Sequence, residues 1–189
     1  MLNLHVVVAS TREGRQGALV GDWFYACAKA HGKFNVELVD LAVVNLPLLD
    51  ESKHPRFHEY EHEHTKAWSA IVERADAFVF VTPEYDFGAP AALLNALHYL
   101  FREWAYKPVG FASYGGVSAG LRGVQMTKQV VTTLKMMPMM EAVAIPFFAK
   151  FIDTETGTFK PGEVQEQAAG VMLDELLRWT NAMKPLRAP

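Results

Sequence analysis

The strongest constraint on the fold is an alternation along the chain between short apolar runs and longer stretches with helical spacing. Most of the short runs are rich in valine and phenylalanine and end at polar or glycine-bearing loops. Such runs are typical of strands that are buried on both faces of a sheet. Strands are predicted at Leu2–Ala9, Asn35–Asp40, Ala77–Thr82, Lys107–Ser113 and Met139–Ile145.

Between these runs, apolar residues recur at the spacing of an amphipathic helix. Val20, Trp23, Phe24 and Cys27 follow that period, and Gly32 lies where a helix C-cap is expected. Helices are predicted at Gly17–His31, Thr65–Arg74, Pro90–Trp104, Leu121–Leu134 and Gly162–Met183. Strands that alternate with helices predict an α/β fold, in which a parallel sheet is covered on both faces.

The length of 189 residues fits a single domain, residues 1–189, and no flexible linker divides it. Two long connections, Leu41–His64 and Pro146–Pro161, interrupt the alternation, and we expect them to be functional or to face a partner. The net charge of -3 lacks the excess of positive charge that is typical of nucleic-acid-binding proteins. The N-terminal stretch MLNLHVVVAS lacks a basic segment, and its apolar run is too short for a secretory signal or a membrane span, so a cytoplasmic location is expected.

In an open parallel sheet, ligands bind beyond the carboxyl ends of the strands. The loop after the first strand has two hydroxyls and two cations beside a helix that starts near Gly17: Ser10, Thr11, Arg12 and Arg15. A helix N-terminus with such neighbours predicts a phosphate site. The loop contains neither G-x-G-x-x-G nor G-x-x-x-x-G-K-[ST], which argues against a Rossmann turn and a triphosphatase loop. A solvated loop with an N-cap is the alternative.

The loop after the third strand is Pro83–Pro90. Pro83 ends the strand, and Gly88 allows close approach of a ligand. Between them are two carboxylates that can accept hydrogen bonds and two rings that can stack: Glu84, Asp86, Tyr85 and Phe87. These groups suit a planar heteroaromatic ligand, although Asp86 could instead be a turn residue. The loop after the fourth strand, Tyr114–Gly120, is glycine-rich and allows the backbone to approach a flat ligand.

Three stretches together resemble the NADPH-dependent FMN reductase family, a flavodoxin-like group that includes quinone, azo-dye and chromate reductases. They are Ser10-Thr11-Arg12, Pro83–Asp86 followed by Pro90 and Leu94–Leu97, and Ser113–Gly116. The resemblance spans Leu2–Ile145, and the middle stretch is the most specific. It implies a flavodoxin-like three-layer sandwich with a five-stranded parallel sheet in the order 2-1-3-4-5 and helices on both faces.

The resemblance also implies non-covalently bound FMN that is reduced by NADPH or NADH and passes electrons to a quinone, an azo compound, a metal oxyanion or free flavin. Because the cofactor performs the chemistry, no side chain needs to act as a nucleophile or as an obligatory base. Two alternatives remain open: a non-enzymatic electron carrier of the flavodoxin type, and a flavin-free interaction protein.

Roles for individual residues follow from the family's motifs. The resemblance implies that the phosphate of FMN is bound by Ser10, Thr11, Arg12, Arg15, Gln16 and Gly17. It implies that the isoalloxazine ring lies along Pro83, Glu84, Tyr85, Asp86 and Phe87. The pyrimidine side of the ring and the ribityl chain are implied to lie beside Ser113, Tyr114, Gly115 and Gly116. Two residues depart from the family's pattern. Arg15 stands where many members have serine or threonine, and Asp86 stands where asparagine is usual, which removes a side-chain donor.

Several features lie outside these motifs. The run HPRFHEYEHEH, with His54, His58 and His62 at every fourth position, allows a helical metal ladder, but we favour a polar lead into the second helix and expect no metal site. Cys27 is expected to be a buried thiol, and the stretch KMMPMM is expected to fill the core. The family forms homodimers, or tetramers of dimers, with the flavin near the subunit boundary. Some of four aromatic residues that are hard to bury within one domain are therefore expected to close the site in trans: Trp104, Tyr106, Phe147 and Phe148.

Overall fold

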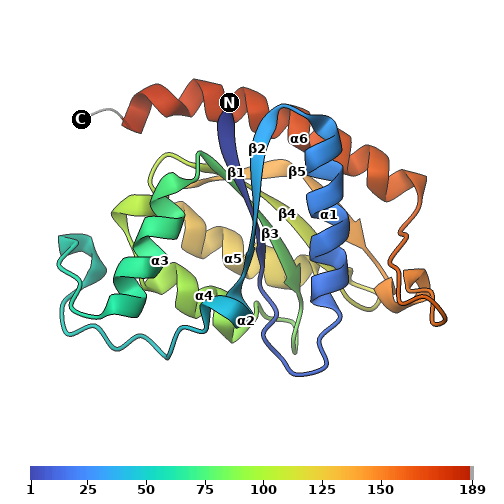
Figure 1. Ribbon diagram of the computed structural model, residues 1–189, viewed down its shortest axis with the longest axis horizontal. Coiled ribbons are helices and arrows are strands. Elements are labelled where there is room, and N and C mark those ends of the chain that lie inside the picture. Colours follow the sequence, from blue (N-terminus) through green and yellow to red (C-terminus); the bar gives the residue numbers. More distant parts are fainter. Residues whose placement is uncertain (188–189) are drawn as a thin grey trace.

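Five strands form one parallel sheet, in the order β2-β1-β3-β4-β5 (Figure 1). The structure is a computed structural model that describes residues 1–187. The strands are β1 (Leu2–Val8), β2 (Phe34–Asp40), β3 (Ala77–Pro83), β4 (Pro108–Tyr114) and β5 (Met137–Ile145). The α/β class and the strand order are confirmed, and each predicted strand end lies within two residues of the observed one.

Six α-helices and four short 3₁₀-helices connect the described strands. The α-helices are α1 (Gly17–His31), α2 (Leu41–Val44), α3 (Glu63–Arg74), α4 (Ala91–His98), α5 (Leu121–Thr133) and α6 (Glu163–Met183). The 3₁₀-helices are η1 (Pro55–Phe57), η2 (Arg102–Trp104), η3 (Phe148–Phe151) and η4 (Lys184–Arg187). The sequence did not predict α2, η1, η3 or η4, because segments this short have too few residues to show a helical period. The residues of η2 lie at the end of the helix predicted at Pro90–Trp104.

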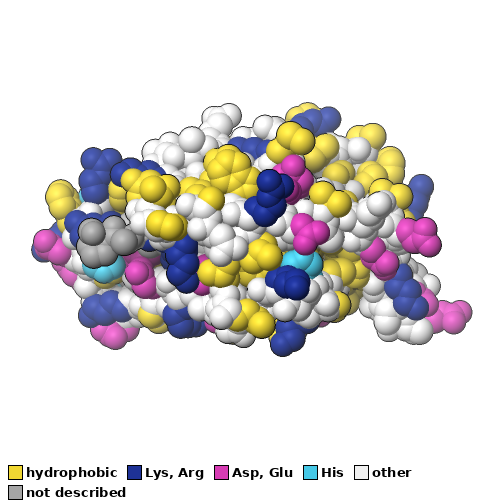
Figure 2. Space-filling view, turned by 90° about the horizontal axis from the view of Figure 1, so that it is seen from above, with side chains coloured by type: hydrophobic (Ala, Val, Ile, Leu, Met, Phe, Trp, Pro, Cys, Tyr) yellow, Lys and Arg dark blue, Asp and Glu magenta, His cyan; other side chains and the backbone are white. Residues whose placement is uncertain are grey.

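The sheet is buried on both faces. Apolar residues of α1 and α6 pack against one face, and those of α3, α4 and α5 pack against the other. Every residue of β3 and β4 is buried, which explains why their sequences are almost continuously apolar. Seen from above, where α6 lies uppermost in Figure 1, the molecule shows charges of both signs mixed with hydrophobic side chains (Figure 2).

The helix predicted at Pro90–Trp104 was wrong in its second half, because α4 already ends at His98. The chain then turns, and two side chains satisfy backbone groups that a continuing helix would have paired. The Trp104 indole donates to the carbonyl of Leu97 (3.2 Å), and the buried Glu103 carboxylate accepts from the amide of Phe101 (3.3 Å). These tertiary contacts outweigh the helical propensity of the segment.

The long connection after β2 lies beside α3 and α4 (Figure 1). The Asn95 amide fastens it, because it donates to the carbonyl of Pro47 (2.7 Å) and accepts from the amide of Leu49 (3.0 Å). The segment is not a continuous helix, since α3 begins only at Glu63. The fourth-residue spacing of its histidines therefore does not align them on one face.

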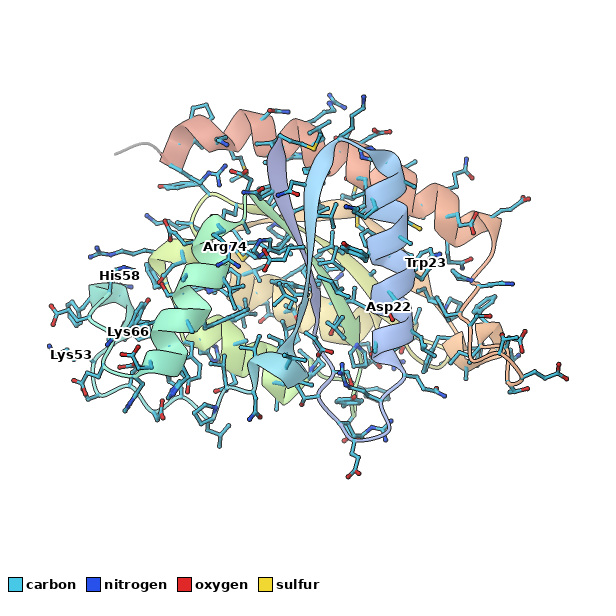
Figure 3. The ribbon with its side chains drawn as sticks, in the orientation of Figure 1. Asp22, Trp23, Lys53, His58, Lys66 and Arg74 are labelled. Carbon is cyan, nitrogen blue, oxygen red and sulfur yellow. The ribbon has the colours of Figure 1, made fainter. Side chains whose placement is uncertain are left out.

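The second long connection, after β5, folds back against the start of α1. It contains η3 and an isolated antiparallel bridge between Ile152 and Phe159. The Phe159 ring packs edge-on against Trp23 of α1, with 5.9 Å between the ring centroids, and Figure 3 shows Trp23 on the side of α1 that faces this connection. The aromatic pair holds the connection near the carboxyl edge of the sheet.

Two expectations about apolar residues were wrong in part. Trp104 is buried within its own domain, because it packs against Trp68, Phe78 and Phe80. Met140 is 86% exposed, because β5 is an edge strand, whereas Met136 and Met139 of the KMMPMM stretch are buried. Cys27 is half-buried, and burial raises the pKa of its thiol, which is unfavourable for a nucleophile. Among residues 1–187, no helix is long and apolar enough to cross a membrane.

A buried lysine binds the last carbonyl groups of α3, and its lowered pKa gives a first prediction about stability. The Lys107 ammonium donates to the carbonyls of Val72 (2.8 Å) and Glu73 (3.1 Å), and burial lowers the pKa of Lys107 to about 8. The unfolded chain binds this proton more tightly than the folded one, so stability should rise with pH between about 8 and 10.4. We expect the free energy of unfolding of the natural protein, relative to Lys107→Met, to rise across this window in urea titrations. A constant difference would contradict the assignment.

Candidate functional site

A cavity of about 480 Å³ lies at the carboxyl edge of the sheet. Its volume is within the range of ordinary cofactor sites. Loops after β1, β3, β4 and β5 line it, with these residues: Ser10, Arg12, Arg15, Gln16, Pro83, Glu84, Tyr85, Tyr114, Gly115, Gly116 and Phe147 to Lys150. The structure thus brings together most of the residues that the sequence predicted for the site.

Hydroxyl groups gather at the end of the cavity nearest α1. The Ser10 and Tyr85 hydroxyls form a hydrogen bond of 2.8 Å. The Tyr114 hydroxyl lies close to Gly17, where an added Cβ would be only 2.1 Å from it, so a larger residue at position 17 would close this space. Burial raises the pKa of Tyr114, which keeps its phenol protonated and able to donate.

The N-terminus of α1 opens at the same place and fits an anion. Gln16, its N-cap residue, gives no side-chain cap, and the first turn contains no acidic residue. The amide of Leu19 donates to the carbonyl of Gln16 (3.1 Å), which leaves the N–H groups of Gly17 and Ala18 for an anion, and the helix dipole favours negative charge there. With the exposed Arg12 and the hydroxyl of Ser10 nearby, this donor set suits the phosphate of FMN.

Arg15 lines the cavity, but its guanidinium is used within the protein. It donates to the carbonyl of Ser10 (3.0 Å) and forms an ion pair with Asp40 at the end of β2. The other Asp40 oxygen accepts from the amide of Ala42 and caps α2 (2.9 Å). Arg15 therefore holds the first loop against β2.

The turn after β3 is a two-residue hairpin. The amide of Tyr85 donates to the carbonyl of Gly88 (3.1 Å), and the amide of Gly88 donates back to Tyr85 (2.8 Å). The central residues, Asp86 and Phe87, have left-handed backbone conformations, with φ of 49° and 68°. This pattern is that of a type I′ turn, in which Asp or Asn is favoured and a phenylalanine is strained. The backbone alone thus explains an aspartate at position 86.

The Glu84 carboxylate, which was expected to contact a ligand, instead binds the N-terminus of α5. Its carboxylate accepts from the amides of Arg122 (2.9 Å) and Gly123 (3.4 Å) and from the hydroxyl of Ser118 (2.9 Å), and it forms an ion pair with Arg122. Burial disfavours the charged form, but these hydrogen bonds outweigh it, so the pKa of Glu84 lies below its ordinary value. The side chain acts as an N-cap for a helix that begins far along the chain.

Three further contacts fix the turn on α5. Gly123 packs so closely that an added Cβ would lie 2.9 Å from the carbonyl oxygen of Gly88. The Met126 sulfur accepts from the amide of Ala89 (3.4 Å). The guanidinium of Arg122 stacks over the Phe87 ring at 4.0 Å from its centroid. The turn is therefore rigidly placed before any ligand binds.

The loop after β4 is joined to the start of the second long connection. Phe147 donates to the carbonyl of Gly116 (3.0 Å) and Phe148 to that of Gly115 (3.2 Å), and Phe148 packs edge-on against Tyr114. Phe147 and Phe148 therefore line the cavity in their own chain. The sequence named both among four aromatic residues, some of which were expected to close the site in trans. Ala149 and Lys150 were not predicted; the aromatic content of that long connection was the available signal.

Some predicted residues lie outside the cavity lining. Thr11 faces a separate, smaller cavity with Asn45 and Asn95. The Ser113 hydroxyl is buried without a hydrogen-bond partner among the described residues. Asp86 and Phe87 lie at the tip of the turn, beyond the lining.

Two histidines of the first connection pair with carboxylates. His58 lies 3.2 Å from the buried Glu103, and His64 lies 2.9 Å from Asp50. Figure 3 shows His58 beyond α3, on the opposite side of the molecule from Trp23. Within residues 1–187, no group of three or more His, Cys, Asp or Glu residues is arranged to hold a metal ion.

The sheet order and the position of the cavity define a flavodoxin-like protein with a site at the carboxyl edge of its sheet. The model of the NADPH-dependent FMN reductase family matches residues 2–150. An NAD(P)H-dependent FMN reductase of Schizosaccharomyces pombe (C4B3.06c) is 40% identical over 145 residues, which cover 75% of this chain and 72% of the relative. A second such protein, ntnL of a Nectria species, is 30% identical over 79% of this chain and 77% of its own length.

Solved structures agree on the fold. The flavoenzyme FerB, an NAD(P)H:acceptor oxidoreductase of Paracoccus denitrificans, superposes with a TM-score of 0.77 at 18% identity, over 97% of this chain and 99% of its own. The chain belongs to the NADPH-dependent FMN reductase family. It is therefore an oxidoreductase that uses FMN and NAD(P)H.

The capping contact of Glu84 gives a second prediction. Glu84→Gln keeps the size of the side chain and removes its charge, so it should lower the free energy of unfolding at pH 7 by about 1 kcal/mol. Because the folded pKa is depressed, this contribution exists above the unfolded pKa of about 4.3 and is lost as the pH falls through the folded value. Urea titrations should therefore show the deficit at pH 7 and a smaller one in acid.

The matched control is Glu59→Gln, which removes a carboxylate that is 60% exposed, lies outside any helix and pairs only with Lys53. We expect it to leave the stability nearly unchanged. If both variants behaved alike, Glu84 would have no special role at α5.

Proposed function

We propose that this protein takes electrons from NADPH or NADH onto bound FMN and passes them to a small acceptor: a quinone, an azo compound, a metal oxyanion or free flavin. When it is bound, FMN supplies the redox chemistry by accepting a hydride and releasing electrons. The main support is the cavity between the uncapped N-terminus of α1 and the rigid turn after β3. Family membership supports the same reading.

Each loop has a proposed role. The first loop binds the phosphate through the hydroxyl of Ser10, the Arg12 guanidinium and the backbone at Gln16 and Gly17, while Arg15 supports this loop from behind. The turn after β3 flanks the ring with the residues Pro83, Tyr85, Asp86 and Phe87, and Glu84 fixes that turn. The loop after β4 borders the pyrimidine and ribityl side with the residues Ser113, Tyr114, Gly115 and Gly116.

The nature of the acceptor rests on chemistry and on relatives. Phe147 lines the cavity and is 48% exposed, and flat apolar acceptors can stack on such a ring. Matching proteins include one named NADPH azoreductase and one named 2-hydroxy-1,4-benzoquinone reductase. We further propose a single cytoplasmic domain over residues 1–189 that works as a homodimer.

The proposal is tested by adding NADPH or NADH to the FMN-loaded protein without oxygen. Bleaching of the flavin absorbance supports the reductase. An unchanged spectrum with both nicotinamides would instead favour an electron carrier of the flavodoxin type, and a colourless protein that fails to take up FMN would favour an interaction protein.

Arg12→Ala gives a third prediction. It removes a charge-assisted contact to the phosphate, which is worth about 1.5 to 3 kcal/mol, so FMN should bind roughly 10 to 150 times more weakly. Fluorescence titration of the apoprotein with FMN measures the effect. The control Arg178→Ala removes an arginine that is 77% exposed on α6 and should leave FMN affinity unchanged. An unaltered affinity for Arg12→Ala would place the phosphate elsewhere.

A further inference from the structure

The cavity contains more positive charge than the protein itself neutralises. Three cations line it, Arg12, Arg15 and Lys150. Arg15 is paired with Asp40, and Glu84, the acidic residue of the lining, is already bound to α5. Within residues 1–187, neither Arg12 nor Lys150 has a carboxylate within 4 Å. Two cations therefore remain for anionic ligands.

These two cations come from different segments. Arg12 belongs to the first loop, beside the N-terminus of α1, whereas Lys150 belongs to η3 after β5. The Tyr114 hydroxyl lies beside Gly17 of α1, and the Tyr114 ring contacts Phe148 at 4.9 Å between centroids. Lys150 lies two residues after Phe148 and lines the cavity from the segment that follows β5. If Arg12 and the N-terminus of α1 hold the phosphate of FMN, Lys150 is left for a second anion.

Lys150 is presented by an anchored segment. The amides of Phe147 and Phe148 bond to the loop after β4, and Phe159 fastens the connection to Trp23. Phe147 has a left-handed φ of 48°, a conformation that is strained for phenylalanine and is typically kept at functional sites. The Lys150 ammonium lies over the Phe147 ring, 4.9 Å from the ring centroid. The lysine therefore lies over an aromatic face at the rim of the cavity.

We propose that Lys150 binds the 2′-phosphate of NADPH and is the residue that favours NADPH over NADH. The inference rests on the proposed function. The two nicotinamides differ only in this phosphate, and an ammonium group is a compact partner for such a dianion. The Phe147 ring adds a cation–π contact that favours this position of the ammonium at the rim of the cavity.

The test compares Lys150→Ala, Lys150→Arg and the natural protein, each loaded with FMN, by anaerobic stopped-flow reduction with both nicotinamides. We expect the ratio of the second-order rate constant of flavin reduction by NADPH to that by NADH to fall about tenfold in Lys150→Ala and to be largely retained in Lys150→Arg. The control Lys160→Ala removes an exposed lysine of the same connection that does not line the cavity, and it should keep the ratio.

A second measurement does not depend on turnover. Adenosine 2′,5′-bisphosphate should bind the FMN-loaded natural protein about ten times more tightly than adenosine 5′-monophosphate in calorimetric titration, and Lys150→Ala should abolish this difference. An unchanged ratio and an unchanged difference in Lys150→Ala would overturn the assignment. So would a loss of FMN affinity in Lys150→Ala, because the lysine would then serve the flavin phosphate.

The two proposals fail differently. If both nicotinamides bleach the natural protein but Lys150→Ala keeps the NADPH preference, only the role of Lys150 is refuted. If neither nicotinamide bleaches it, the proposed function is refuted and the role of Lys150 with it.

Discussion

Burial of the central strands on both faces is the constraint on which the rest of this structure depends. Every residue of β3 and β4 is buried, so each face of the sheet needs its own layer of helices. Parallel strands with helical crossovers satisfy that need, and they place all strand ends at one edge. The loops after β1, β3, β4 and β5 therefore meet at one cavity, beside the N-terminus of α1. The site follows from how the core is covered.

Two charged residues of the motifs fix loops in place. Arg15 fastens the first loop to β2 through Asp40, and Glu84 fastens the turn after β3 to α5 through Arg122. Buried or half-buried charges need such partners, and paired charges are poorly available to a ligand. The groups left for a ligand are hydroxyls, backbone N–H groups and the two cations Arg12 and Lys150. A sequence motif thus mixes residues that bind with residues that position.

The fold could be predicted from sequence because its signals are local and repeated. Apolar runs and helical periods extend over many residues, so the bounds of the strands and of four of the five predicted helices agree with the structure to within a few residues. The strand order, which the family resemblance implied, also agrees. The end of α4 could not be predicted, because it depends on the Trp104 indole and the Glu103 carboxylate, whose partners are tertiary contacts.

The site could be predicted only in part, for the same reason. Ser10 and Tyr85 are far apart in sequence, yet both follow strands, and that rule brings them together. The partner of Glu84 is the start of a helix 38 residues further along, and nothing near Glu84 in the sequence indicates it. That Phe147 and Phe148 line the cavity of their own chain could not be predicted, because their hydrogen bonds to Gly116 and Gly115 depend on the ends of two neighbouring strands.

The turn at Asp86 and Phe87 shows how these contacts make a binding surface rigid. Two consecutive left-handed residues, one of them a phenylalanine, cost free energy that an isolated loop would relax. Here α5 holds the conformation, because Glu84, Gly123 and Met126 contact the turn and Arg122 covers the Phe87 ring. The aspartate in place of an amide fits this backbone without any contribution from a ligand. The shape of the turn is therefore set by the protein, and a flat ring that binds beside it meets a surface already in its final form.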